Sequence, residues 1–106
     1  MRMAKVNVNK NNYSQKLKHS AEVLRALAHP LRLRILKYID ANKSVNVNKI
    51  YNALNLEQSI TSQHLRILRV AGVVLTKREG KFIHYSVDYT KVITILKAVD
   101  AFLDAE

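Results

Sequence analysis

Residues 54–72 (LNLEQSITSQHLRILRVAG) carry the side chains best suited to chemistry in this chain. On a helix of 100° per residue, one side is mostly apolar and holds Ile60, His64, Ile67, Leu68 and Ala71. The opposite side is polar and holds Gln58, Ser59, Ser62, Arg66 and Arg69, with Gln63 at its edge. Short amides and hydroxyls can hydrogen-bond to the edges of bases, and arginines bind phosphates. The spacing therefore predicts a helix that enters the major groove of DNA.

Length and composition limit the class of protein. The chain has 106 residues, of which 48% are hydrophobic, and this suits one globular domain. It has no cysteine, so we expect neither a disulfide framework nor a thiolate metal site. The longest apolar runs are far shorter than a membrane span, and the N-terminal residues lack the pattern of a secretory signal. We expect a cytoplasmic protein.

The charge of the chain is strongly basic and unevenly distributed. Lys and Arg number 18 against 8 for Asp and Glu, which gives a formal net charge of +10. Residues 1–50 hold eleven basic and two acidic side chains, whereas residues 92–106 hold one and three. A polyanionic partner is expected, and it should contact the chain away from its C-terminal end.

Two helices should precede the DNA-binding motif. Residues 1–12 show no apolar period and are predicted to be a flexible arm, followed by one domain over residues 13–106. Ser14 is the predicted N-cap of the first helix, and Pro30 marks the start of the second. The second helix should bury Leu31, Ile35, Leu36 and Ile39 and end within residues 40–43.

The next two helices have the lengths and spacing of a helix-turn-helix. Asn46 can cap a short helix that ends near Leu54, and a turn of about three residues leads to the helix described above. Gly72 is placed to end that helix with a positive φ angle.

A β-hairpin is predicted after Gly72. Residues 73–78 and 81–87 are rich in β-branched and aromatic side chains, and Glu79-Gly80 stands between them. A two-residue turn there places Val74 opposite Tyr85 and Thr76 opposite Ile83, with one apolar face towards the helices. The tip of the hairpin is cationic and holds Lys77, Arg78 and Lys81.

The last predicted helix follows Asp88 and is too apolar for the surface of a monomer. Its apolar row consists of Val92, Ile95, Leu96, Val99, Phe102 and Leu103. This row must pack on the domain or on a second chain.

Residues 24–36 (LRALAHPLRLRIL), 56–74 (LEQSITSQHLRILRVAGVV) and 77–87 (KREGKFIHYSV) resemble the ArsR/SmtB family of winged-helix repressors. The resemblance covers about residues 14–105. It implies a mainly α winged helix-turn-helix fold with about five helices and a two-stranded wing. It also implies a homodimer joined by the first and last helices, in which Leu17 and Leu24 would join the apolar row from Val92 to Leu103. By the same resemblance, Gln58, Ser59, Thr61, Ser62, Gln63 and His64 read the groove, and Lys77, Arg78 and Lys81 belong to the wing.

The metal sites that the family resemblance would suggest are not expected in this chain. Asn46 and Asn48 occupy the positions of the family's metal-binding cysteines, and an amide cannot replace a thiolate. The positions that match the ligands of the last helix hold Tyr89, Lys91, Phe102 and Ala105. We therefore predict no metal and no cofactor.

For several basic residues, a structural role is favoured over a functional one. His64 falls on the inward half of its helix, so a histidine bonded to backbone is favoured over one that contacts bases. Arg32 and Arg34 are expected to pack or form salt bridges, although one of them could reach a phosphate. His29 and His84 are not expected to bind metal, because neither has a second ligand at useful spacing.

The sequence thus predicts a sequence-specific regulator of double-stranded DNA, most simply a homodimeric repressor on an imperfect palindrome. Arg66 and Arg69, with the cations of the wing, would mainly supply phosphate affinity. The alternatives are a winged helix that binds RNA or a protein, and an activator that displaces another protein from DNA. Motifs of enzymes are absent from the sequence.

Overall fold

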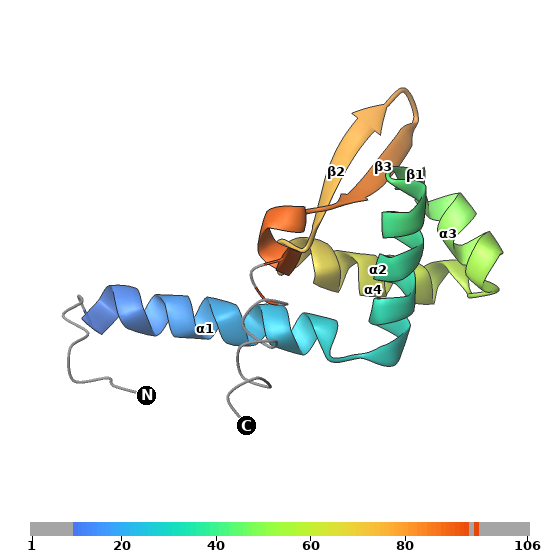
Figure 1. The fold of residues 1–106 in the computed structure, drawn as a ribbon. Helices are drawn as coiled ribbons and strands as arrows, with labels where there is room; N and C mark the ends of the chain where they lie inside the picture. The colour runs from blue at the N-terminus through green and yellow to red at the C-terminus, as the bar shows by residue number, and fades with distance from the viewer. Residues whose placement is uncertain (1–9, 94, 96–106) are drawn as a thin grey trace.

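The computed structural model describes residues 10–93 and residue 95. It contains four complete helices in its described part, α1 (Lys10–Leu27), α2 (Pro30–Asn42), α3 (Val47–Leu54) and α4 (Gln58–Val70). The strands are β1 (Val45–Asn46), β2 (Val74–Glu79) and β3 (Phe82–Val87), and residues 89–93 are helical again. Helices α2 and α4 lie between α1 and the hairpin of β2 and β3 (Figure 1). Helix α3 lies at the end of the domain opposite to the N-terminal end of α1 (Figure 1). The predicted winged architecture is confirmed.

The core forms where α2, α3 and α4 meet the base of the hairpin. Ile35 and Ile39 of α2, Ile50 of α3, Leu68 of α4 and Val73 are fully buried. Of the described side chains of α1, Val23 and Ala26 near its C-terminal end belong to this core. The inner side of α4 therefore packs on the core, whereas the N-terminal half of α1 extends beyond it (Figure 1).

Capping groups set the ends of the helix-turn-helix. The side chain of Asn46 accepts a hydrogen bond from the backbone N–H of Lys49 at 3.0 Å, so the predicted cap of α3 is confirmed. Three residues, 55–57, separate α3 from α4, and Asn55 is left-handed at φ 57°. After α4, Gly72 has φ 79°, and the N–H of Val73 donates to the carbonyl of Leu68 at 2.9 Å. This is the Schellman arrangement that ends a helix at glycine.

The first helix begins earlier than predicted. Helix α1 starts at Lys10, so Ser14 is not its N-cap. Residues 10–13 contain neither proline nor glycine, and a helix can extend through them at little cost. Of the predicted arm, residues 1–9 lie outside the described residues.

The hairpin has a different register from the predicted one, and its sheet has a third strand. Val74 pairs with Val87 and Thr76 with Tyr85, which shifts the pairing by two residues. The turn is formed by Gly80 and Lys81, because Gly80 with φ 64° occupies the first turn position. The apolar face packs on the helices only at its base, since Ile83 is exposed. Strand β1 adds to β3 through Val45 and Tyr85, and the sequence did not reveal it.

Within the described part of the chain, no helix is long and apolar enough to cross a membrane.

Candidate nucleic-acid interface

Helix α4 is rotated about its axis relative to the prediction. Its buried side chains are Thr61, Leu65 and Leu68, whereas Ile60 and Ile67 are 38% and 42% exposed. At 100° per residue, the buried stripe lies about 80° from the predicted one. The rotation moves Gln63 from the edge of the polar side towards its middle.

The polar side chains of α4 form one exposed surface, which we name the outer face of α4. All six predicted members are exposed: Gln58, Ser59, Ser62, Gln63, Arg66 and Arg69. The first four belong to the first two turns of the helix, and the two arginines follow them. In helix-turn-helix proteins the N-terminal residues of the second helix contact base edges. The outer face of α4 thus offers amides and hydroxyls where bases are read and cations beyond them.

Thr61 does not belong to this face, and its predicted contact with DNA is wrong. Its side chain is fully buried, and its hydroxyl donates to the carbonyl of Glu57 at 2.8 Å. A buried hydroxyl must find a partner inside the protein, and the carbonyl one turn earlier supplies it. Thr61 therefore anchors the first turn of α4 to the core.

His64 lies at the inner edge of α4, as its place on the helix predicted, and it is half-buried. Its partner is a side chain and not the expected backbone group, because its Nδ1 lies 3.2 Å from a guanidinium nitrogen of Arg32. The ring of His29 is close, with 4.8 Å between ring centroids. Burial, then the charges of His29 and Arg32, lowers the pKa of His64 below its usual 6.5. This environment favours a neutral histidine.

Arg32 and Arg34 are structural groups in the described part of the chain. Arg32 donates through Nε to the carbonyl of Ala26 at 2.7 Å and through a terminal nitrogen to that of Arg25 at 3.2 Å. Arg34 donates to the carbonyl of Leu54 at 3.4 Å. Both were expected to pack or form salt bridges, and their partners in the structure are carbonyl oxygens and a histidine rather than carboxylates.

The wing presents its cations at its tip. Lys77 and Arg78 lie on β2, Lys81 lies in the turn, and all three are exposed. Lys77 approaches Glu79 at 3.8 Å, Arg78 donates to the carbonyl of Gly80 at 3.3 Å, and Lys81 lies 5.7 Å from the centre of the Phe82 ring. Such exposed contacts are weak, so these cations remain available to phosphates.

The relatives of this chain identify its family. A family model described as "Bacterial regulatory protein, arsR family" matches residues 29–76. The transcriptional repressor PagR of Bacillus anthracis is 41% identical over 85 residues, which cover 79% of this chain and 84% of PagR. The chain belongs to the arsR family. An HTH-type transcriptional regulator of Methanocaldococcus jannaschii is 38% identical over 86 residues, covering 81% of this chain and 97% of that regulator.

Solved structures of similar proteins share the fold. The crystal structure of PagR matches with a TM-score of 0.70 and 38% identity, over 81% of this chain and 98% of PagR. The solution structure of a homodimeric winged helix-turn-helix DNA-binding domain from Mycobacterium bovis matches with a TM-score of 0.72 and 26% identity, over 95% of both chains. This arsR-family chain is a transcriptional regulator with a winged helix-turn-helix fold.

The residues predicted to join two copies fall into three groups. Leu17 and Leu24 of α1 are 54% and 46% exposed. Val92 and Ile95 are half-buried and pack against the core of this chain. The other four predicted residues lie outside the described residues: Leu96, Val99, Phe102 and Leu103.

The described residues contain no group of three or more His, Asp or Glu side chains that could hold a metal ion. At the positions that would carry ligands by family resemblance, the Asn46 oxygen caps α3, and the Lys91 ammonium lies 2.8 Å from Nε2 of His19. An ammonium repels a cation, and an amide engaged in a cap is not free to bind one.

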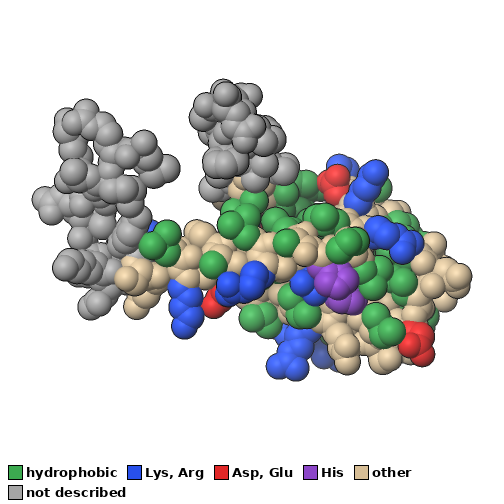
Figure 2. Space-filling view, turned by 90° about the horizontal axis from the view of Figure 1, so that it is seen from below, with side chains coloured by type: hydrophobic (Ala, Val, Ile, Leu, Met, Phe, Trp, Pro, Cys, Tyr) green, Lys and Arg blue, Asp and Glu red, His purple; other side chains and the backbone are tan. Residues whose placement is uncertain are grey.

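Two exposed apolar side chains of α4 were not expected at the surface. Ile60 and Ile67 flank the outer face on the side of His64. Apolar and basic side chains also share the face seen in Figure 2, where acidic side chains are few. The sequence could not predict that Ile60 and Ile67 are exposed, because branched apolar residues on a helix normally point to the core.

Proposed function

We propose that two copies of this chain bind one operator duplex and repress transcription, in the cytoplasm where that DNA lies. The observation that carries the proposal is the outer face of α4, on which six polar or basic side chains are exposed together. Gln58, Ser59, Ser62 and Gln63 would read base edges, since hydroxyls and amides match the donors and acceptors of the major groove. The chain acts by binding in this proposal and performs no catalysis.

The arginines of α4 and the cations of the wing would supply affinity for phosphates. These are Arg66, Arg69, Lys77, Arg78 and Lys81. If all five bind phosphates in both copies, ten contacts give a log–log salt slope of about −9 as an upper bound. Two outer faces should then meet an imperfect palindrome with half-site centres about 34 Å apart.

The exposed leucines of α1 support the second copy. Leu17 and Leu24 lie on one stripe of α1 and are about half exposed in the single chain. An apolar stripe of this kind is stabilised when another chain covers it. The relative from Mycobacterium bovis is homodimeric, which agrees with this use of the surface.

The regulatory signal in this proposal is not a transition metal bound at the positions that family resemblance suggests. Support comes from Asn46, whose oxygen caps α3, and from Lys91, which places an ammonium at a ligand position. Zinc added to the protein–operator complex should leave the DNA bound. Release of the operator by a stoichiometric amount of zinc would refute this part of the proposal.

Light scattering combined with binding competition tests the proposal. The wild-type protein should have twice the mass of one chain and should prefer duplex DNA to RNA of the same sequence. Exchanging Leu17 and Leu24 for lysine should yield a folded monomer with weak operator affinity. Leu75→Lys is the matched control for the mass measurement, because Leu75 of β2 is 51% exposed and is not among the predicted interface residues. A monomeric wild type that prefers RNA would contradict the proposal.

A further inference from the structure

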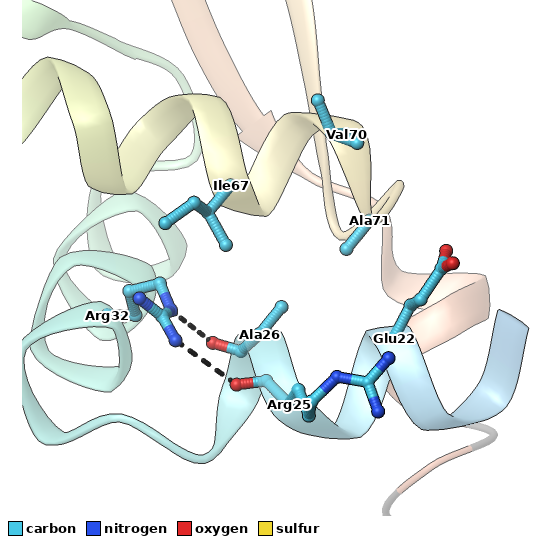
Figure 3. Close-up of a pocket in the computed structure, with 7 residues that line it drawn as sticks. All are labelled: Glu22, Arg25, Ala26, Arg32, Ile67, Val70 and Ala71. Carbon is cyan, nitrogen blue, oxygen red and sulfur yellow. Dashed lines mark hydrogen bonds between the residues drawn. The ribbon is translucent and has the colours of Figure 1, made fainter. Parts of the chain in front are cut away.

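Arg32 of α2 joins three helices. Its Nε and one terminal nitrogen donate to the carbonyls of Ala26 and Arg25, in the last turn of α1 (Figure 3). These carbonyls lie where a helix leaves its oxygens without intrahelical partners, and a guanidinium there also suits the helix dipole. The other terminal nitrogen lies 3.2 Å from Nδ1 of His64 on α4. We call this set of contacts the Arg32 link.

The chemistry of the Arg32 link fixes the proton on His64. A guanidinium only donates hydrogen bonds, so Nδ1 of His64 must accept. A neutral histidine with an accepting Nδ1 carries its proton on Nε2. A doubly protonated His64 would place an N–H against the guanidinium, and the bond to Arg32 would be lost.

We propose that Arg32 is a positioning residue for DNA recognition, which holds α4 at a fixed orientation to α1 only while His64 is neutral. The inference rests on the proposed function, in which α1 joins two copies and α4 reads bases. If α1 belongs to the dimer interface, its orientation to α4 sets the separation of the two reading helices. Loss of the link then lowers specific affinity more than affinity for random DNA, because phosphate contacts tolerate a shift that base contacts do not.

Two of the charged and titratable groups near His64 favour its neutral form. Arg32 of α2 and His29, which precedes α2, both oppose a positive charge there. Helix α1 contributes Glu22 and Arg25, which line a pocket with Arg32, Ile67 and Val70 (Figure 3). On the other elements packed against α4, the charged groups are exposed: Lys49 of α3, and Lys77, Arg78 and Glu79 of β2.

The direction of the pH effect follows from this environment. The pKa of His64 is lowered in the folded protein, first by burial and then by the two charges. The link is therefore complete above the ordinary histidine pKa of about 6.5, and it is lost only as the pH falls through the lowered pKa of His64 in the folded protein. Specific DNA binding should weaken on acidification, although added positive charge alone would strengthen binding to any DNA.

His64→Asn separates the two effects. The Asn oxygen can accept from Arg32 as Nδ1 does, and it does not titrate. The probes are a duplex recovered by selection from a random pool and a random duplex of equal length. For the wild type, the ratio of their affinities should fall about three- to tenfold between about pH 7.5 and the lowest pH at which the protein stays folded, which is the range of an ordinary net hydrogen bond. For His64→Asn the ratio should stay constant, and for His64→Leu it should be low at both pH values.

Two further variants serve as controls. His84→Asn on β3 should retain the wild-type pH profile, because His84 lies outside the Arg32 link. Arg32→Met should show a low ratio that no longer depends on pH, with folding checked by circular dichroism at each pH. A wild-type profile in His64→Asn would overturn the inference and leave the proposed function standing. Failure of the wild type to prefer the selected duplex at any pH would instead refute the proposed function.

Discussion

The hydroxyl of Thr61 donates to the carbonyl oxygen of Glu57, 2.8 Å away and one turn earlier in the chain. The same oxygen accepts the backbone N–H of Thr61 at 3.0 Å. The Glu57 side chain makes no capping bond, so Thr61 supplies the side-chain contact that holds the start of α4. The helix that carries the base-reading candidates is thus anchored from within the core.

Replacing Thr61 by valine tests this anchoring role. Valine has nearly the same shape but lacks the hydroxyl, so the free energy of unfolding should fall by about 1 kcal/mol. The folded variant should keep the operator preference of the wild type, which titration of both duplexes measures. A variant of unchanged stability that loses this preference would show that Thr61 does contact DNA.

Ser62 and Gln63 should carry sequence preference. Both residues are exchanged for alanine, which cannot hydrogen-bond to a base. The difference in binding free energy between operator and random DNA should fall by about 1–3 kcal/mol for each bidentate contact with a base that is lost. Affinity for random DNA should change little, because the phosphate-binding side chains remain. Gln15→Ala on α1 is the control, since Gln15 is also exposed. Equal reductions of affinity on both duplexes would remove these residues from the base-reading set.

The wing should contribute to the salt dependence of binding. Lys77, Arg78 and Lys81 are replaced by glutamine. The log–log slope of DNA affinity against salt concentration should then decrease in magnitude by about 0.9 for each phosphate that the wing no longer binds. A control with the same change of charge replaces three exposed lysines of α1 and α2, namely Lys16, Lys18 and Lys37. If the control flattens the slope as much as the wing variant, net charge rather than the wing explains the effect.

Tyr89 should make stability depend on alkaline pH. Its hydroxyl donates to Oδ1 of Asp40 at 2.5 Å, and this bond, more than burial or charge, raises the pKa of Tyr89 above its usual 10. The stabilisation is therefore present below about pH 10 and is lost as the pH rises through the raised pKa. Tyr89→Phe should melt at a slightly lower temperature near neutrality and lose less on alkalinisation than the wild type. Parallel melting curves of the two proteins against pH would contradict this role.

Tyr38→Phe is the matched control for that experiment. Tyr38 lies on α2 like Asp40, and no hydrogen bond of its hydroxyl is found among the described residues. Its removal should leave the alkaline profile of the melting temperature unchanged.

The sequence predicted the elements of this fold well where capping residues and turns have clear chemistry. Asn46 and Gly72 were expected to begin and end their helices, and both do so. The side of α4 that is buried was less predictable, because at three positions the residue type does not match the burial. Ile60 and Ile67 are apolar but exposed, and Thr61 is polar but buried through a bond to its own helix. Apolar periodicity alone could not detect these exceptions.

Features that depend on partners distant in sequence were also missed. Gly80 could occupy either turn position of the hairpin, and pairing of Thr76 with Tyr85 decides between them. Strand β1 has two residues, too few for a pattern, and exists because β3 lies beside it. The Arg32 link needs residues 25, 32 and 64 to meet, and only the packing of three helices shows that they do.

Reading of duplex DNA by the outer face of α4 is the central claim, and sequencing the fragments retained from a random duplex pool tests it most directly. The wild type should enrich two inverted half-sites with centres about ten base pairs apart, one helical turn. The Ser62 and Gln63 double alanine variant should degrade that motif within each half-site while keeping the spacing. Fragments without any shared motif, or an unchanged motif from the variant, would contradict the claim.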